Sequence, residues 1–149
     1  MKLDFIDFDK HIEKETGKTI TEIFDTSGEK KFRYLEHEHL KTLLHEDNVV
    51  ISLGGGTPCF HNNMELINNS GTSVYLNMDV DSLVNRLSKA KNKRPLIRDL
   101  NDTELRYFIE TNLEKRQSTY QRANYTIQGK NSSPEEITDV IIKITGKEK

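Results

Sequence analysis

A short apolar strand that ends in three consecutive glycines is the strongest constraint in this sequence. Residues 49–53 read Val-Val-Ile-Ser-Leu, a β-branched run typical of a buried strand, and Gly54, Gly55 and Gly56 follow directly. Because glycine has no Cβ, the backbone there can approach a ligand closely or adopt a positive φ. In open α/β sheets, ligands bind just beyond the carboxyl ends of the strands. The three glycines therefore predict either the floor of a ligand pocket or a plain strand-to-helix turn.

Strands and helices alternate along the chain, which predicts an α/β fold with a parallel sheet and helices on both faces. Short apolar runs predict strands at 3–8, 49–53, 72–78 and 125–128. Capping residues, glycines and apolar periodicity predict helices at 10–15, 29–45, 62–69 and 103–123. They also predict a helix that begins at 19, one that ends at 87 and one that begins at 134. The length of 149 residues predicts a single domain over 1–149.

Composition excludes several classes of partner. Charged residues make up 31% of the chain but the net charge is only −2, so neither a nucleic-acid surface nor a membrane surface is expected. No apolar run reaches the roughly 18 residues of a membrane span. Cys59 is the only cysteine, which excludes a disulfide framework and fits a reducing compartment. We expect a cytoplasmic monomer.

One phosphate-binding signature is present only in part. Gly17-Lys18-Thr19 matches the end of the P-loop pattern G-x-x-x-x-G-K-[ST], but the position of its first glycine is Ile12 and the preceding residues look helical. Gly17 instead suits the C-terminus of one helix, and Thr19 with Glu22 suits the capping box of the next. We therefore reject a P-loop at this position.

Two pairs of charged residues have spacings that would bring their side chains together in a functional site. Asp7 and Asp9 lie two residues apart at the end of the first predicted strand, so both carboxylates are expected on one face. Asp9 can equally be the N-cap of the helix that begins at Lys10. Arg33 and Glu36 lie three residues apart on a helix, which gives either a forked donor held ready for a carboxylate or an ordinary surface ion pair.

Further positive charges lie in the second half of the chain. Residues 88–102 are polar and basic around Pro95, and they predict either an exposed, mobile lid loop that contains Arg94 or a solvated charge run. Arg116 lies on an otherwise apolar face of the helix predicted at 103–123. A partly buried arginine of this kind needs an anionic partner.

Six motifs follow one another in a fixed order over nearly all of the chain. They are Phe5-Ile6-Asp7-Phe8-Asp9; Thr16-Gly17-Lys18-Thr19-Ile20 with Ile23-Phe24; Gly28-Glu29 with Phe32-Arg33-x-x-Glu36; Gly54-Gly55-Gly56-Thr57-Pro58; Arg94-Pro95-Leu96; and the stretch from Arg116 to Tyr120. In combination they resemble the shikimate kinase family of P-loop kinases, which is related to the nucleoside-monophosphate kinases. The resemblance implies a three-layer parallel sheet flanked by helices, with a basic lid loop over about 88–102.

The resemblance also implies an activity and an acceptor site. It implies ATP-dependent phosphorylation of the 3-hydroxyl of shikimate in the biosynthesis of aromatic amino acids. Asp9 would hold that hydroxyl and act as, or assist, its base, while Arg33 and Arg116 would bind the shikimate carboxylate. Glu36 would orient Arg33, and the glycines of the loop would line the pocket: Gly54, Gly55 and Gly56.

On the nucleotide side, the resemblance implies ATP and Mg²⁺ as cofactors. Asp7 would help to position the Mg²⁺ shell. Arg94 would close over the phosphates with the lid and stabilise charge on the transferring phosphoryl group. Lys130 occupies the region where the family tends to place an arginine against adenine, and it is only a weak substitute.

The chain departs from the family at its N-terminus. The family begins with a strand, a P-loop and a helix, roughly 25 residues that this sequence lacks, and the absent strand is central in the family's sheet. We expect a shikimate kinase sequence without its N-terminus, inactive alone for want of the P-loop. The alternative from another class is a non-catalytic shikimate-binding protein, and a gluconate-type or nucleotide kinase is disfavoured by the set of Arg33, Glu36 and Arg116.

Overall fold

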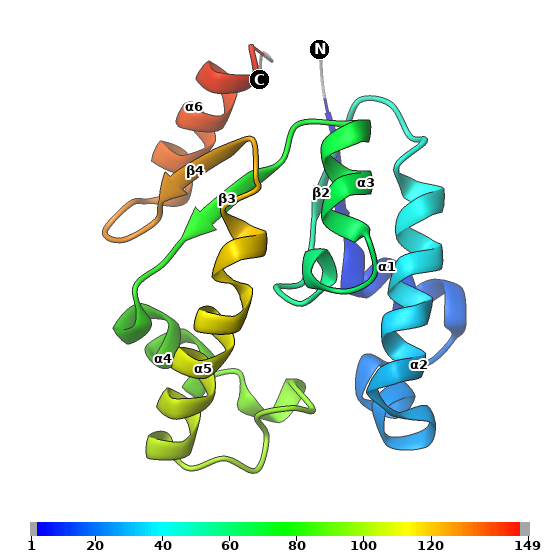
Figure 1. Ribbon diagram of the computed structural model, residues 1–149, viewed down its shortest axis with the longest axis vertical. Coiled ribbons are helices and arrows are strands. Elements are labelled where there is room, and N and C mark those ends of the chain that lie inside the picture. The colour runs from blue at the N-terminus through cyan, green and yellow to red at the C-terminus, as the bar shows by residue number, and fades with distance from the viewer. Residues whose placement is uncertain (1–2, 147–149) are drawn as a thin grey trace. The chain divides into compact units, whose positions relative to one another are not determined.

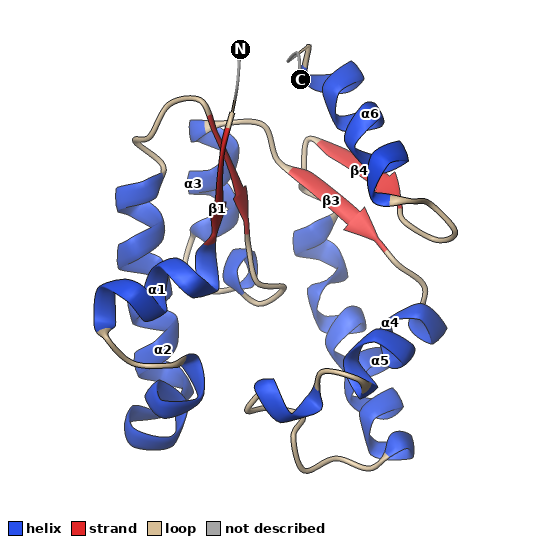
Figure 2. Ribbon diagram, turned by 180° about the vertical axis from the view of Figure 1, so that it is seen from behind, coloured by secondary structure: helices blue, strands red, loops and turns tan. Residues whose placement is uncertain are grey.

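The computed structural model describes residues 3–146, apart from the side chain of Lys93, and it has the expected α/β class (Figures 1 and 2). Its strands pair in parallel, and within the described residues they form two two-stranded sheets. The chain divides into two compact units. The first unit contains the chain up to Ser73 and from Ile142 onward, and the second unit is Val74–Ile141.

The first unit is built on the strand pair that carries the glycine loop. Strand β1 (Asp4–Asp7) pairs with β2 (Val49–Ser52), with Ile6 opposite Ile51. Helix α3 (Asn63–Ser70) lies over one face of this pair in both ribbon views. The apolar core lies between the strands, α1 (Phe8–Thr16), α2 (Ile20–Leu43) and α3, and its buried members are Phe8, Ile12, Ile23, Phe32, Leu40, Leu43 and Ile67.

The start of α1 corrects one expectation. Asp7, not Asp9, is the N-cap: its side chain accepts a hydrogen bond from the backbone N–H of Lys10 at 3.2 Å. The helix therefore begins at Phe8, whose ring is fully buried, and Asp9 lies in the first helical turn. The two carboxylates are thus not two positions of one strand.

The junction between α1 and α2 confirms that no P-loop forms there. Gly17 ends α1 in the left-handed conformation, with a φ of 67°. Thr19 and Glu22 then form the predicted capping box at the start of α2. Gly28 interrupts α2 with a φ of 78°, so that the helix predicted at 29–45 is its second part and ends at Leu43.

The second unit repeats the strand-and-helix pattern. Strand β3 (Val74–Asn77) pairs in parallel with β4 (Tyr125–Gln128). Asp79 caps α4 (Val80–Ser88), and Asn101 starts α5 (Asp102–Tyr120) with a capping box.

The lid prediction required an exposed segment between α4 and α5. The segment is exposed only in part. Ile97 is only 3% exposed and packs with Leu105 and Ile109 of α5. Residues 91–93 form a single 3-10 turn within this segment.

The last helix forms as predicted but has no buried face. Ser133 and Glu136 cap the start of α6 (Pro134–Thr145) in both directions, at 3.2 and 2.7 Å. None of the residues of α6 is buried, and Val140 is 41% exposed. Apolar periodicity predicts the helix, but it does not supply a surface that covers it.

No helix in the described part of the chain is long and apolar enough to cross a membrane.

Candidate active site

An arginine–carboxylate cluster on α2 is the most buried charged group of the first unit. Arg33 is 7% exposed and Glu36 is 1% exposed, and Nη1 of Arg33 donates to Oε2 of Glu36 at 2.7 Å. Glu29, one helical turn earlier, accepts from Nε and Nη2 of the same guanidinium at 3.3 and 3.2 Å. The expectation of an ordinary surface pair is therefore wrong for Arg33 and Glu36. A charge buried to this degree is retained only where its hydrogen bonds are made.

The glycine loop lies directly against this cluster. A Cβ added to Gly56 would lie 2.6 to 2.8 Å from the guanidinium atoms of Arg33. A Cβ on Gly54 would lie 3.5 Å from Oδ1 of Asp9, 3.5 Å from Oγ1 of Thr57 and 4.0 Å from Oε1 of Glu36. None of the three glycines has a positive φ, so at Gly56 glycine serves the close approach of Arg33 and not a special backbone conformation.

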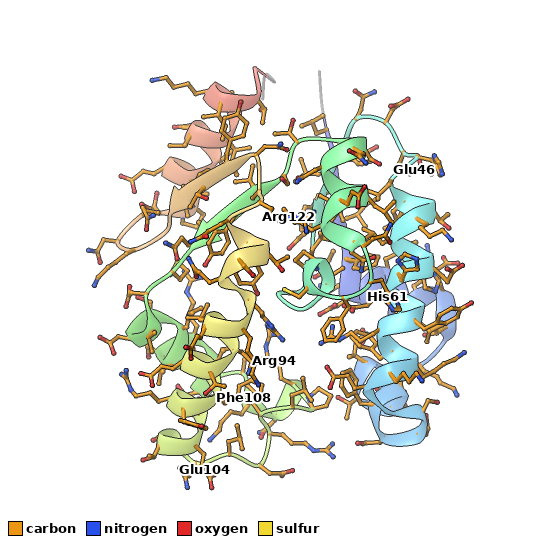
Figure 3. The ribbon with its side chains drawn as sticks, in the orientation of Figure 1. Glu46, His61, Arg94, Glu104, Phe108 and Arg122 are labelled. Atoms are coloured by element: carbon orange, nitrogen blue, oxygen red, sulfur yellow. The ribbon has the colours of Figure 1, made fainter. Side chains whose placement is uncertain are left out.

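A chain of buried hydrogen bonds holds the loop onto α2. The hydroxyl of Thr57 donates to Oε1 of Glu36 at 2.7 Å, and Nδ2 of Asn63 donates to the carbonyl of Thr57 at 2.8 Å. Thr57 and Asn63 are both 0% exposed. Nδ1 of His37 is 2.7 Å from Oδ1 of Asn63. The centre of the His37 ring lies 4.8 Å from that of the His61 ring, and Figure 3 shows His61 against α2.

The roles of Thr57 and Asn63 were not predicted from the sequence. Thr57 falls in the Gly-Gly-Gly-Thr-Pro motif, which is the one signal that could have pointed to it. Asn63 and His37 are 26 residues apart, so no local spacing connects them.

An aromatic ring completes the surroundings of Arg33. The guanidinium carbon lies 4.2 Å from the centre of the Phe60 ring and 5.3 Å from that of Phe32. Stacking on an aromatic face is a contact that arginine makes and that favours a fixed guanidinium plane. Arg33 is therefore held by carboxylates at its edge and end, by Phe60, and by the glycine loop.

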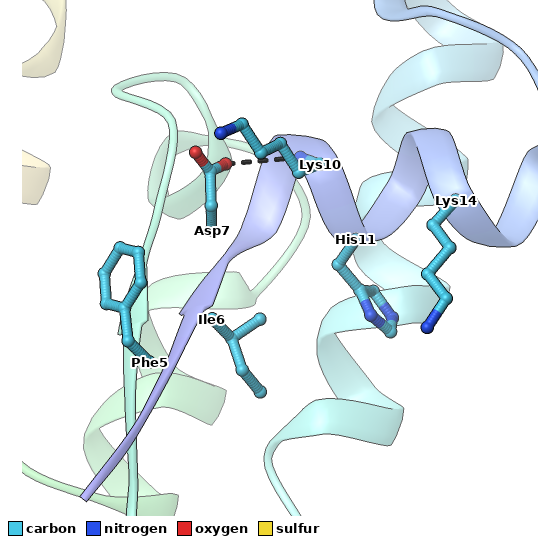
Figure 4. A pocket seen from close by; sticks show the side chains of 6 residues that line it. All are labelled: Phe5, Ile6, Asp7, Lys10, His11 and Lys14. Atoms are coloured by element: carbon cyan, nitrogen blue, oxygen red, sulfur yellow. Dashed lines mark hydrogen bonds between the residues drawn. The ribbon is translucent and has the colours of Figure 1, made fainter.

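Asp7 lies beside a second feature, an open hollow of about 350 Å³ (Figure 4). Its walls come from β1 and α1, and they are Phe5, Ile6, Asp7, Lys10, His11 and Lys14. Asp7 is already engaged there as the helix cap. Among residues 3–146, no group of three or more acidic, histidine or cysteine side chains could hold a metal ion.

The remaining predicted site residues belong to the second unit. Arg94 is exposed and follows the 3-10 turn of the basic segment (Figure 3), and Arg116 is half-buried on α5. Within the described chain, neither side chain forms an ion pair.

Lys130 has a partner within the second unit. Its ammonium lies 3.7 Å from Oδ2 of Asp79, the cap of α4. The backbone N–H and hydroxyl of Ser82 hold the pKa of Asp79 below its usual range, and Lys130 adds to that effect. In this structure Lys130 therefore pairs with the N-cap residue of α4. The nucleotide role predicted for Lys130 did not include this contact.

The structure thus brings six of the predicted residues together in the first unit: Asp9, Arg33, Glu36, Gly54, Gly55 and Gly56. A fixed guanidinium next to a carboxylate-bearing turn and an open backbone can bind an anionic, hydroxylated small molecule.

Comparison with known proteins places this cluster in a family context. A family model described as shikimate kinase matches residues 1–145. A shikimate kinase of Parabacteroides distasonis is 40% identical over 146 residues, which cover 95% of this chain and 84% of that protein. A shikimate kinase of Azobacteroides pseudotrichonymphae is 46% identical over 125 residues, covering 83% of this chain and 74% of that one.

Solved structures agree with the sequence matches. The crystal structure of shikimate kinase from Bacteroides thetaiotaomicron aligns with a TM-score of 0.85 and 39% identity, over 97% of this chain and 82% of that chain. Shikimate kinase from Acinetobacter baumannii, solved in complex with shikimate, aligns with a TM-score of 0.88 and 29% identity, over 95% of this chain and 78% of that chain.

Proposed function

The chain belongs to the shikimate kinase family, and on that premise we propose that Arg33 binds the carboxylate of shikimate in the site where its 3-hydroxyl is phosphorylated. One observation carries this proposal: a guanidinium only 7% exposed, fixed by Glu36, lies against a glycine loop whose first residue adjoins Asp9. Arginine held in this way presents a planar, forked donor that matches a carboxylate.

The roles of Asp9 and the glycines are supported by the same arrangement, and that of Arg116 by the family resemblance. Asp9 holds the 3-hydroxyl and accepts its proton as phosphoryl transfer proceeds, because its Oδ1 lies at the glycine loop. Gly54, Gly55 and Gly56 let the substrate ring approach the backbone. Arg116 provides a second cation for the substrate carboxylate.

The nucleotide-side roles come from the family resemblance. We propose that Arg94 closes on the phosphates of ATP and that Lys130 lies near the nucleotide base. Asp7 would offer one oxygen to the Mg²⁺ shell, which fits a cation that binds through one or two carboxylates, water and phosphates. Mg²⁺ would neutralise charge on the phosphates.

We propose that these 149 residues alone transfer phosphate at a negligible rate. The sequence contains no complete G-x-x-x-x-G-K-[ST] pattern, and its one partial match is used for helix ends. Phosphoryl transfer depends on positioning and electrostatics, so a site without a phosphate cradle lacks most of the catalysis.

The same observation favours a second candidate, a shikimate-binding protein without catalytic activity. The two candidates differ when a strand and P-loop segment from a relative is fused upstream. A kinase site would then phosphorylate shikimate with ATP, whereas a pure binding site would still bind shikimate without turnover. A folded fusion that binds both ligands and stays inactive would favour the second candidate.

A calorimetric titration with shikimate tests the proposed acceptor site. We expect saturable binding that Arg33→Ala abolishes, while Lys41→Ala, an exposed change on the same helix, leaves it intact. No binding by a chain that circular dichroism shows to be folded would overturn the assignment.

We also propose that the protein acts as a monomer in the cytoplasm. The single, half-buried Cys59, which leaves no partner for a disulfide within the chain, supports a reducing compartment. Sedimentation equilibrium should return a mass near 17.3 kDa, and twice that mass would contradict the monomer.

A further inference from the structure

We propose that Glu29 competes with the substrate carboxylate for Arg33, so that substrate binds by displacing Glu29 from the guanidinium. This inference rests on the proposed function, since it concerns how the same arginine takes its ligand. It adds a group that lowers the affinity of the site for a carboxylate.

The donors of Arg33 are already in use on the edge that a carboxylate would choose. A carboxylate binds an arginine best with two parallel N–H bonds, and Nε with Nη2 forms one such edge. Oε1 of Glu29 accepts from both of these atoms, at 3.3 and 3.2 Å. A substrate carboxylate therefore reaches that edge only when Glu29 leaves it.

Glu29 is also the weaker of the two partners. Its side chain is 43% exposed and uses a single oxygen, whereas that of Glu36 is 2% exposed and bonds at 2.7 Å. The second oxygen of Glu36 is held by the hydroxyl of Thr57. An exposed pair is stabilised little because water competes for both charges, so Glu29 is the partner that yields.

Glu29 lies next to a break in the helix and to open space. Gly28, the preceding residue, breaks α2 with a φ of 78°, and nothing lies within 4 Å of a Cβ placed there. Glu29 is thus the first residue after a break in the helix, while Glu36 lies about two turns into the regular part.

Charge balance favours the exchange. Arg33 carries one positive charge and faces the two carboxylates of Glu29 and Glu36, with Asp9 at the same glycine loop. Among the groups of the first unit, a further carboxylate added without the departure of Glu29 would increase the excess of negative charge. If the substrate carboxylate takes the place of Glu29, the number of carboxylates around Arg33 stays the same.

The test measures shikimate affinity by calorimetry for the wild-type chain, Glu29→Gln and a matched control. Glu38→Gln is that control, because Glu38 lies on the same helix, is 44% exposed and pairs with Lys41 at 3.2 Å. We expect Glu29→Gln to bind shikimate about two- to fivefold more tightly, the range of an exposed ion pair, and Glu38→Gln to match wild type. Unchanged or weaker binding by Glu29→Gln would overturn the proposal, the weaker result showing that Glu29 positions Arg33 for substrate.

A second probe separates this inference from the proposed function. If wild type and both variants fail to bind shikimate, the proposed function fails, and sodium acetate then serves as the probe. The Nε–H signal of Arg33, identified in NMR spectra by its loss in Arg33→Lys, reports acetate binding directly. Competition by Glu29 predicts saturation at lower acetate concentration in Glu29→Gln than in wild type, and equal or higher concentrations would refute it.

Discussion

The two units each contain an arginine between two carboxylates, and the two clusters differ mainly in burial. Arg33, with Glu29 and Glu36, has a side chain 8% exposed. Arg106 bonds to Asp81 and to Glu110, but its side chain is 46% exposed. The sequence spacings are similar, since each arginine has a partner four residues away on its own helix. Spacing alone therefore does not distinguish a structural or binding cluster from a surface one.

The difference lies in the neutral groups around each arginine. Thr57, Phe60 and Gly56 surround the first cluster and exclude water from it. The second cluster is solvated, and the bond and charge of Asp81 chiefly raise the pKa of Arg106 above its usual value. A higher arginine pKa changes nothing at neutral pH, because the group is charged in either case.

Removing one partner of the buried cluster should have the largest effect. We expect Glu36→Ala to lower the free energy of unfolding by about 3–5 kcal/mol, because Arg33 would lose its buried partner and keep only the half-exposed Glu29. Thr57 would lose its acceptor as well. Urea unfolding followed by circular dichroism measures the change, with the exposed Glu38→Ala as control. A loss below about 1 kcal/mol would show that the cluster is solvated after all.

A methyl group at the glycine loop tests the close contact with Arg33. Gly56→Ala places Cβ within 2.8 Å of the guanidinium, which must then move away from Glu36. We expect a stability loss of about 1–3 kcal/mol, as for overpacking, and at least a tenfold loss of shikimate affinity.

Gly71→Ala is the matched control for that change. Nothing lies within 4 Å of a Cβ at Gly71, and its φ of −171° suits any residue. Both variants are measured by urea unfolding and calorimetry. Equal behaviour of the two variants would contradict the contact.

Breaking the exposed cluster should do little. We expect Arg106→Ala to leave the urea midpoint nearly unchanged, and any difference from wild type to vanish in 0.5 M salt, because exposed pairs are screened. A midpoint shift as large as that of Glu36→Ala would remove the distinction between the clusters.

Local rules predicted the elements of both units almost equally well. The capping box at Thr19, the helix end at Gly17 and all four strands follow from neighbouring residues, and the structure has them. The error at Asp7 and Asp9 is also local, since two possible caps stood two residues apart.

Tertiary features were predicted less well. Arg33, Glu36 and the glycine loop were recognised by motif, but the bonds of Thr57 and Asn63 join residues 6 to 26 positions apart, and no periodicity records them. The exposure of α6 also lies beyond local rules, because apolar spacing does not reveal what covers a helix.

The smallest expected effect is on the pH dependence of stability, and it comes from a histidine pair on α1 and α2 and not from the arginine cluster on α2. The rings of His11 and His39 lie 5.6 Å apart. Burial, and then the positive charge of His11, lower the pKa of His39 below its ordinary 6.5, against the opposing effects of Glu15 and Glu38. Between its folded and unfolded pKa values the unfolded chain binds more protons, so stability rises with pH up to about 6.5 and then levels.

We therefore expect wild type to lose more stability than His39→Gln when the pH falls from 7.5 to 5.5. The glutamine variant cannot take up the proton that His39 binds on unfolding, so its unfolding curve should depend less on pH. Urea midpoints at the two pH values measure the difference, and Lys41→Gln serves as an exposed control on the same helix. Equal pH dependence in wild type and His39→Gln would assign the response to other groups of the first unit.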